Sequence, residues 1–444
     1  MDKVLCSVGV DVGTTTTQLI VSQIRVKNNV SAFAVPEMEI TGRQVLYRSP
    51  VYFTPLIRDQ LVDGDAIRKI IKQEYERAGI CRETVDTGAV IITGETSRKE
   101  NAATVLESLS DLAGDFVVAT AGPHLESVLA AKGAGAVAWS EQTGKRVMHF
   151  DIGGGTSNWA LIENGKILET GCLNVGGRLV KVDRNGNVTY VSPAIKKLCK
   201  LKEGDAATIS QIQEVATLLA EALEMAAGLR EPTWLLEQLS TAEAGVVRRV
   251  QAGGCVFSFS GGVADCIENR YDWLKFGDMG PALGQAIRES LLCRGEYRVG
   301  EETIRATVIG AGCHSAQLSG STVFYRNVEF PLKNLTVVTG TEELARLDAP
   351  GILALEGIEG SGYGAVCALA DRIAVAVKGP VFLALEEDAA KSLGHALALR
   401  LPEDRPVLCI DRVRLRQGDY LDVGQPIGPA LPVVVKTLIL QEEV

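Results

Sequence analysis

The sequence predicts an α/β protein in which two related lobes face each other across a cleft and a third α/β module follows. Residues 8–17 and 147–157 each read as a strand that ends in an aspartate and turns through glycine and hydroxyl residues into a second strand. The two aspartates, Asp11 and Asp151, are 140 residues apart. The third observation is the length, because 444 residues suffice for two or three domains with separate cores.

Charge and composition exclude two classes of partner. The chain has 45 basic and 55 acidic residues, a net charge of −10, and no long basic run. Nucleic acids and anionic membranes are bound through a positive surface, so the sequence predicts neither partner. The chain starts directly with a strand, shows no signal peptide, and has no apolar stretch long enough to span a bilayer. We therefore expect a cytoplasmic protein.

Cysteines and histidines indicate neither disulfides nor a metal centre. The ten cysteines are scattered among mostly apolar neighbours without a Cys-x-x-Cys pair, which is typical of free, buried thiols. The four histidines are His124, His149, His314 and His395, and they are not arranged as a metal site. We expect His149, on the strand before Asp151, to be structural.

The two aspartate turns have the residue types that a phosphate cradle needs. Glycine lets backbone N–H groups approach an anion without a Cβ in the way, and a strand-end carboxylate can hold a hydrated Mg²⁺ on the same phosphates. One such turn alone is more often a tight corner of a sheet, but a pair favours the cradle. The candidate metal ligands are Asp11 and Asp151, and the candidate phosphate-binding residues are Gly13, Thr14, Thr15, Gly153, Gly154, Gly155 and Thr156.

The elements between the two turns are expected in the following order. A hairpin over residues 1–24 leads into mostly extended chain up to residue 60. Apolar residues at helical spacing predict a helix over 65–75, which Gly79 ends.

A buried strand over 89–96 and a helix over 102–112 come next. Glu95, at the end of that strand, either positions water or a metal ion in the cleft or caps the following helix, and the sequence favours neither role. Residues 123–138 are rich in Ala and Gly, which predicts a helix packed closely between the lobes.

After the second turn, Asn164-Gly165 predicts a type I′ turn and so a further hairpin. Strands are expected on either side of the polar turn 183–187. An apolar stripe within 210–227 predicts the strongest helix of the chain.

A buried strand over 255–259 then runs into Gly261-Gly262, and a helix with closely spaced small residues is expected over 278–287.

The order of these motifs resembles that of the actin-like ATPase superfamily. The two aspartate turns are similar to its phosphate 1 and phosphate 2 motifs, Gly261-Gly262 to its adenosine motif, and the helix over 278–287 to its connect 2 helix. The resemblance implies two ribonuclease H-like lobes around a nucleotide cleft that binds ATP and Mg²⁺. It also implies that Gly261 and Gly262 contact the adenosine, with Gly310 and Gly312 in 308–314 as a rival site ranked second because no connect-like helix follows.

We expect three units: the first lobe over 1–138, the second lobe over 139–320 and a C-terminal α/β module over 321–444. In the last unit, strands are expected over 321–325, 336–338, 407–410 and 433–435, a helix over 386–399, and a flexible or tightly turned loop over 357–364.

Within the superfamily the chain resembles the reactivating factors of ethanolamine ammonia-lyase. The similar stretches are 11–18, 93–102, 149–158 and 259–265, and the resemblance extends over most of the chain. It implies a chaperone-like ATPase whose partner is that lyase. Such a factor expels damaged cobalamin from the lyase and lets intact adenosylcobalamin enter. It also implies a cytoplasmic location compatible with a bacterial microcompartment, and leaves the oligomeric state open, a homodimer included.

Two other functions stay open at this point. A small-molecule kinase of the sugar or acetate kinase type would share the nucleotide motifs but needs a carboxylate as base for an acceptor hydroxyl. No second acidic residue is convincingly placed for that role. An actin-like filament protein would self-associate, and the acidic composition gives no positive sign of it.

Overall fold

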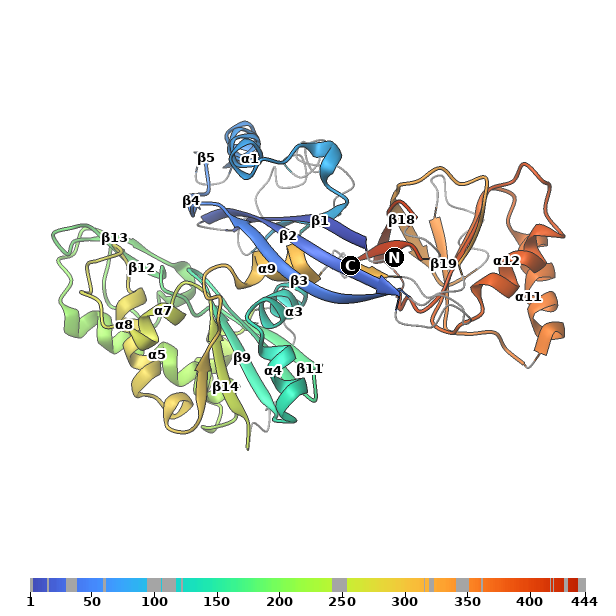
Figure 1. The fold of residues 1–444 in the computed structure, drawn as a ribbon. Helices are drawn as coiled ribbons and strands as arrows, with labels where there is room; N and C mark the ends of the chain where they lie inside the picture. The colour runs from blue at the N-terminus through green and yellow to red at the C-terminus, as the bar shows by residue number, and fades with distance from the viewer. Residues whose placement is uncertain are drawn as a thin grey trace.

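A computed structural model of the protein shows three large β-sheets, each packed against helices (Figure 1). The described residues are 3–13, 16–28, 38–58, 61–93, 105, 117–120, 123–241, 254–314, 316–318, 323–340, 351–360, 362–415, 417, 419–426 and 430–437. Glu95, Thr14, Thr15 and nearly all of the helix predicted over 102–112 lie outside them.

The first sheet has the strand order β3-β2-β1-β7-β8, and a short strand, β4, pairs with β2. Strands β1, β2 and β3 are antiparallel neighbours, whereas β7 and β8 continue the sheet in parallel with β1. The chain between 25 and 60, expected only to be extended, contributes the edge strand β3. The bounds are β1 Lys3–Val12, β2 Thr16–Asn28, β3 Met38–Arg48, β4 Tyr52–Phe53, β7 Thr87–Ile92 and β8 Val117–Thr120, with a separate small ladder of β5 Leu56–Arg58 and β6 Leu61–Val62.

The second sheet repeats this topology, in the order β11-β10-β9-β14-β15. Its first three strands are again antiparallel, and β14 and β15 are again parallel to the first. The predicted type I′ turn is confirmed, because Asn164 and Gly165 have φ angles of 49° and 74°. The bounds are β9 Val147–Ile152, β10 Ser157–Glu163, β11 Lys166–Leu173, β14 Val256–Ser260 and β15 Tyr297–Val299.

Helices cover both faces of the two sheets because alternate residues of each strand point to opposite faces. On the first sheet, Val8 and Val10 pack with Ile67 of α1, and Leu5 packs on the other face with Leu129 of α3. On the second sheet, α5 covers the face of Phe150, while α3 and α4 cover the opposite face. The bounds are α1 Gly64–Ala78, α3 Pro123–Gly133, α4 Ala136–Thr143, α5 Ile209–Ala226, α6 Trp234–Leu239, α7 Ala264–Glu268 and α8 Gly280–Glu289.

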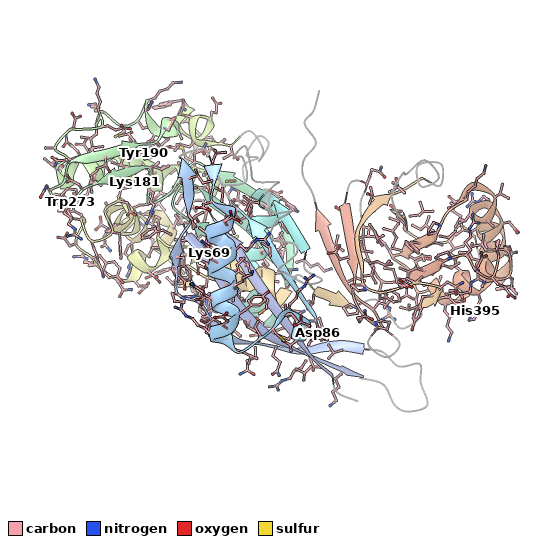
Figure 2. All side chains as sticks on the ribbon, turned by 90° about the horizontal axis from the view of Figure 1, so that it is seen from above. Lys69, Asp86, Lys181, Tyr190, Trp273 and His395 are labelled. Atoms are coloured by element: carbon pink, nitrogen blue, oxygen red, sulfur yellow. The ribbon has the colours of Figure 1, made fainter. Side chains whose placement is uncertain are left out.

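The predicted helices of the two lobes are largely confirmed. Helix α1 ends at Gly79, which adopts the left-handed conformation (φ 67°) that a C-terminal cap requires. Helix α5 begins with a capping box in which Thr208 and Gln211 exchange hydrogen bonds. The polar turn over 183–187 joins β12 (Val180–Val182) to β13 (Val188–Val191). This hairpin, with Lys181 and Tyr190, lies at the end of the molecule opposite His395 (Figure 2).

The helix that crosses between the lobes is α9 (Ala306–His314), which corrects two predictions. Helix α8, predicted to connect the lobes, packs on α5 and α7 within the second lobe instead, whereas α9 packs on α3, β1 and β2. The stretch with Gly310 and Gly312, the rival adenosine site, is therefore a buried helix. The sequence Val308–Gly312 looks like a strand running into glycines, but these glycines serve close helix packing.

The third sheet has the order β16-β23-β22-β18-β19-β20-β21-β17, with a parallel centre from β18 to β21. Helices α11 (Gly362–Ala376) and α12 (Ala390–Ala398) pack on one face. The predicted loop over 357–364 is shorter than expected because α11 begins at Gly362. The bounds are β16 Ala316–Leu318, β17 Phe324–Arg326, β18 Leu332–Val338, β19 Gly351–Leu355, β20 Val381–Leu385, β21 Val407–Ile410, β22 Asp419–Val423 and β23 Pro432–Thr437.

The third sheet lies beside the far ends of the long strands of the first sheet, away from the second lobe (Figure 1). Strand β16 contacts β3, and β23 contacts β8. None of the described helices is both long and apolar enough to cross a membrane.

The crossing of α3 and α9 gives a first prediction, that Gly310→Ala destabilises the protein. A Cβ at Gly310 would lie 2.0 Å from the backbone oxygen of Leu129, and overpacking of this kind costs about 1 to 3 kcal/mol. The melting temperature should therefore fall. The control is Gly364→Ala, an exposed position in α11 where a Cβ meets nothing within 4 Å. Equal melting temperatures for the two variants would contradict the packing argument.

Candidate nucleotide-binding site

A cleft of about 300 Å³ lies where the two lobes meet. Both aspartate turns and the loop after β14 line it, together with the first residues of α8 and α9. Of the predicted site residues that the structure describes, all contribute to its lining: Asp11, Gly13, Asp151, Gly153, Gly154, Gly155, Thr156, Gly261 and Gly262.

The two aspartate turns have the same backbone geometry. In the first, the N–H of Gly13 donates to the carbonyl oxygen of Thr16 at 2.9 Å, and in the second Gly153 donates to Thr156 at 2.9 Å. Each bond joins the second and fifth residues after the aspartate. The hydrogen bond confirms that the two motifs are structural copies, and both glycines line the cleft.

Asp11 is held by a threonine from the neighbouring parallel strand. Because β7 runs parallel to β1, the residue after β7 lies beside the end of β1, and Thr93 Oγ1 donates to Asp11 Oδ1 at 2.9 Å. A polar residue at the carboxyl end of an adjacent parallel strand is a signal that sequence reasoning could have used. The predicted residue was instead Glu95, two residues further along the chain.

Asp151 accepts hydrogen bonds on both carboxylate oxygens. Ser260 Oγ donates to Oδ1 at 2.5 Å, and Thr307 Oγ1 of helix α9 donates to Oδ2 at 3.3 Å. His149 lies buried behind them, with Nε2 2.9 Å from Ser260 Oγ and Nδ1 3.1 Å from Ser258 Oγ. The predicted structural role of His149 agrees with this position, and burial lowers the pKa of its ring to about 3.

Asp151 is buried and Asp11 is half-buried, and this loss of solvent sets their protonation in the absence of a cation. Burial raises the pKa of Asp11 to about 7, with a smaller upward contribution from the charge of Asp151, and burial raises the pKa of Asp151 to about 6. The hydroxyl donors oppose this shift. Two desolvated carboxyl groups facing one cleft are favourably placed to balance a divalent cation.

The residues fit a cation held through its water shell better than one ligated directly. Among the described residues there is no cluster of three or more His, Cys, Asp or Glu side chains that could hold a metal. Mg²⁺ keeps several waters and needs only one or two protein carboxylates beside the phosphates of its nucleotide.

The loop after β14 depends on a glycine for two reasons. Gly261 has φ 85°, and a Cβ there would lie 2.3 Å from the backbone oxygen of Ile152. The loop therefore lies directly against the strand that carries Asp151. Gly262 lines the cleft beside it, where a flat ring system could approach the backbone.

The segment after β11 was not anticipated as part of the site. The N–H groups of Gly177 and Arg178 donate to the carbonyl oxygens of Gly153 and Gly154 at 3.0 and 2.7 Å. These bonds place the Arg178 side chain on the cleft wall, where its Nε lies 3.2 Å from Asp278 Oδ2. No local pattern in the sequence marks such a long-range contact.

The paired hairpins, the repeated strand order and the shared cleft define an α/β protein with the actin-like ATPase fold. A family model described as "Ethanolamine utilisation protein EutA" matches residues 3–356 and 342–441. The chain belongs to this family.

Two curated relatives extend along almost the whole chain. The "Ethanolamine ammonia-lyase reactivase EutA" of Salmonella typhimurium strain LT2 is 38% identical over 465 aligned positions, and that of Escherichia coli K12 is 39% identical over 465. In each case the match covers 98% of both chains.

Solved structures match the chain more distantly. A PPX-GPPA enzyme of Aquifex aeolicus has a TM-score of 0.43 at 13% identity, covering 69% of this chain and 99% of its own. The ethanolamine utilization protein EutJ of Carboxydothermus hydrogenoformans has a TM-score of 0.35 at 18% identity, covering 69% and 88%.

The raised carboxyl pKa values predict how stability depends on pH without metal. A folded-state pKa above the unfolded value means that the folded state binds more protons, so stability falls as pH rises from about 4 to about 7. Asp11→Asn keeps an acceptor for Thr93 and removes this loss. In the presence of a chelator at pH 8, the free energy of unfolding of the variant should exceed that of the parent by about 1 kcal/mol or more, measured as a higher melting temperature. This difference should shrink toward pH 5. Parallel melting curves at every pH would contradict the burial argument.

Proposed function

We propose that the protein is an ATP-dependent reactivating factor for ethanolamine ammonia-lyase. The observation that carries the proposal is the 38–39% identity, across 98% of both chains, to two proteins named as reactivases of that lyase. The cleft supplies the physical means, since its two turns and two carboxylates suit a nucleotide and its metal ion.

In this proposal each part of the cleft has a role. Asp11 and Asp151 hold Mg²⁺ through its waters, and the phosphate oxygens accept hydrogen bonds from the two turns, including Thr14 and Thr15. Gly261 and Gly262 lie against the adenosine. Glu95, outside the described residues, remains a candidate for orienting the attacking water, because phosphoryl transfer mainly requires positioning and charge balance.

Nucleotide binding would act on the lyase through a change of shape. ATP shifts an equilibrium between conformations only by its differential affinity for them, and a ligand that touches both lobes favours the closed arrangement. The proposed outcome is release of damaged cobalamin from the lyase and entry of intact adenosylcobalamin. We further propose that the protein works in the cytoplasm in association with a microcompartment, and that its units are 1–138, 139–320 and 321–444.

The nucleotide site can be tested without the lyase. MgATP at about a hundred times its dissociation constant should stabilise the protein by roughly 2.7 kcal/mol, measured as a raised melting temperature. Asp11→Asn and Asp151→Asn should remove this shift and most ATP hydrolysis, whereas the exposed control Asp205→Asn should keep both. Parental ATP hydrolysis in both site variants would refute the metal assignment, and stabilisation by GTP alone would refute the adenosine assignment to Gly261 and Gly262.

The second test separates a reactivating factor from a small-molecule kinase. The lyase is first inactivated with its cobalamin in place and then mixed with the protein, MgATP and fresh adenosylcobalamin. We expect lyase activity to return only when all three are added. ATP turnover of the protein alone should be slow and unaffected by sugars, glycerol, acetate or ethanolamine. Rapid phosphorylation of one of these compounds, with no recovery of the lyase, would favour the kinase.

A further inference from the structure

The charge of the cleft is strongly one-sided. Among its described lining residues, five are acidic, Asp11, Glu126, Asp151, Asp265 and Asp278, and Arg178 is the one cation. A nucleoside triphosphate brings about one more negative charge than a diphosphate, and a charged guanidinium is the side chain best suited to pair with phosphate oxygens. Among the described lining residues, Arg178 is therefore the one cationic side chain that can pair with the additional phosphate.

Arg178 stands on the loop that would hold the phosphates. Its N–H donates to the carbonyl oxygen of Gly154 at 2.7 Å, and the preceding Gly177 donates to Gly153 at 3.0 Å. A Cβ at Gly176 would lie 2.3 Å from the oxygen of Gly154, so the two segments are in direct backbone contact. The base of the arginine is thus fixed beside the second turn, and its side chain alone is free to change direction.

The guanidinium has two contacts at present. Nε lies 3.2 Å from Asp278 Oδ2, and the Arg178 side chain is 27% exposed whereas Asp278 is buried. The guanidinium carbon also lies 5.5 Å from the ring centroid of Phe53, a residue of the first lobe that is 74% exposed. The cation–π contact is worth about 1 kcal/mol or less. The N–H of Gly280 also donates to Asp278 Oδ1, so the buried carboxylate keeps a donor if the guanidinium leaves. A bound phosphate, which is a strong charged acceptor for a guanidinium, can therefore compete with both contacts.

Backbone pairing and a neighbouring hydrogen bond hold Phe53 next to the first aspartate turn. Phe53 pairs with Thr16 across the β2–β4 ladder, and the next residue, Thr54, donates to the carbonyl oxygen of Gly13 at 2.7 Å. Tyr52, on the other side, donates to buried Glu74 of α1 at 2.5 Å. Phe53 therefore has a fixed place beside the first turn, with its ring facing an arginine from the opposite lobe.

From this geometry we propose that Arg178 distinguishes a nucleoside triphosphate from a diphosphate by binding the terminal phosphate, for which it leaves Asp278 and Phe53. This inference rests on the proposed nucleotide site and adds the residue that binds the third phosphate. It makes the contact between Arg178 and Phe53 a feature of the cleft without triphosphate.

The test compares the affinities of the full chain for MgATP and MgADP by calorimetry. Arg178→Gln should weaken MgATP binding roughly tenfold to a hundredfold and MgADP binding less than about threefold. Asp278→Asn keeps an acceptor for the N–H of Gly280 and removes the competing charge, so MgATP should bind roughly two- to fivefold more tightly. Phe53→Leu should shift affinity in the same direction as Asp278→Asn.

The control is Arg298→Gln. The guanidinium carbon of Arg298 also lies over an aromatic ring, 4.5 Å from the ring centroid of Trp139, but Arg298 does not line the cleft. This variant should bind both nucleotides as the parent does. If Arg178 served only a structural ion pair, Arg178→Gln and Asp278→Asn would weaken binding alike, and the inference would be wrong. Equal losses of MgATP and MgADP in Arg178→Gln would also overturn it. A parent that binds neither nucleotide would instead overturn the proposed function and, with it, this inference.

Discussion

The close approach of helix α9 to helix α3 and strand β1 is the constraint on which the two-lobe arrangement depends. A Cβ at Gly133 would lie 1.9 Å from the oxygen of Ala306, and one at Gly9 would lie 2.6 Å from the oxygen of Val308. Backbone therefore meets backbone where the lobes join, and any larger residue would separate them. The same helix carries Thr307, which donates to Asp151, so the spacing of the lobes and the orientation of a site carboxylate are set together.

The site also shows a conflict between stability and function. Desolvated carboxyl groups with raised pKa values oppose folding at neutral pH. Their hydroxyl partners, Thr93, Ser260 and Thr307, offset part of this cost. Ionisable groups with such strongly shifted pKa values are typical of functional sites, where some stability is given up for chemistry.

How much the sequence could predict depended on whether the signal was local. The two aspartate turns and the Asn164-Gly165 hairpin were predictable because period-two strands and glycine turns lie within a few residues of each other. Thr307 and Arg178 were not, since they reach the cleft only through packing of distant segments. Helix α9 was misread because glycine usually marks a turn, whereas Gly310 is needed for helix contact. Helix α11 was missed because its first turn is rich in glycine and reads as a loop.

The long strands of the first lobe have a mechanical consequence. Strand β2 begins at the first aspartate turn and is 13 residues long. Its partner β3 contacts β16 of the third sheet, which lies beside the far ends of these strands (Figure 1). A strand of that length is a lever arm of roughly 40 Å, whose far end moves by about 0.7 Å for each degree of rotation. A small rotation of the first sheet about α9 would thus displace the third sheet by several ångströms.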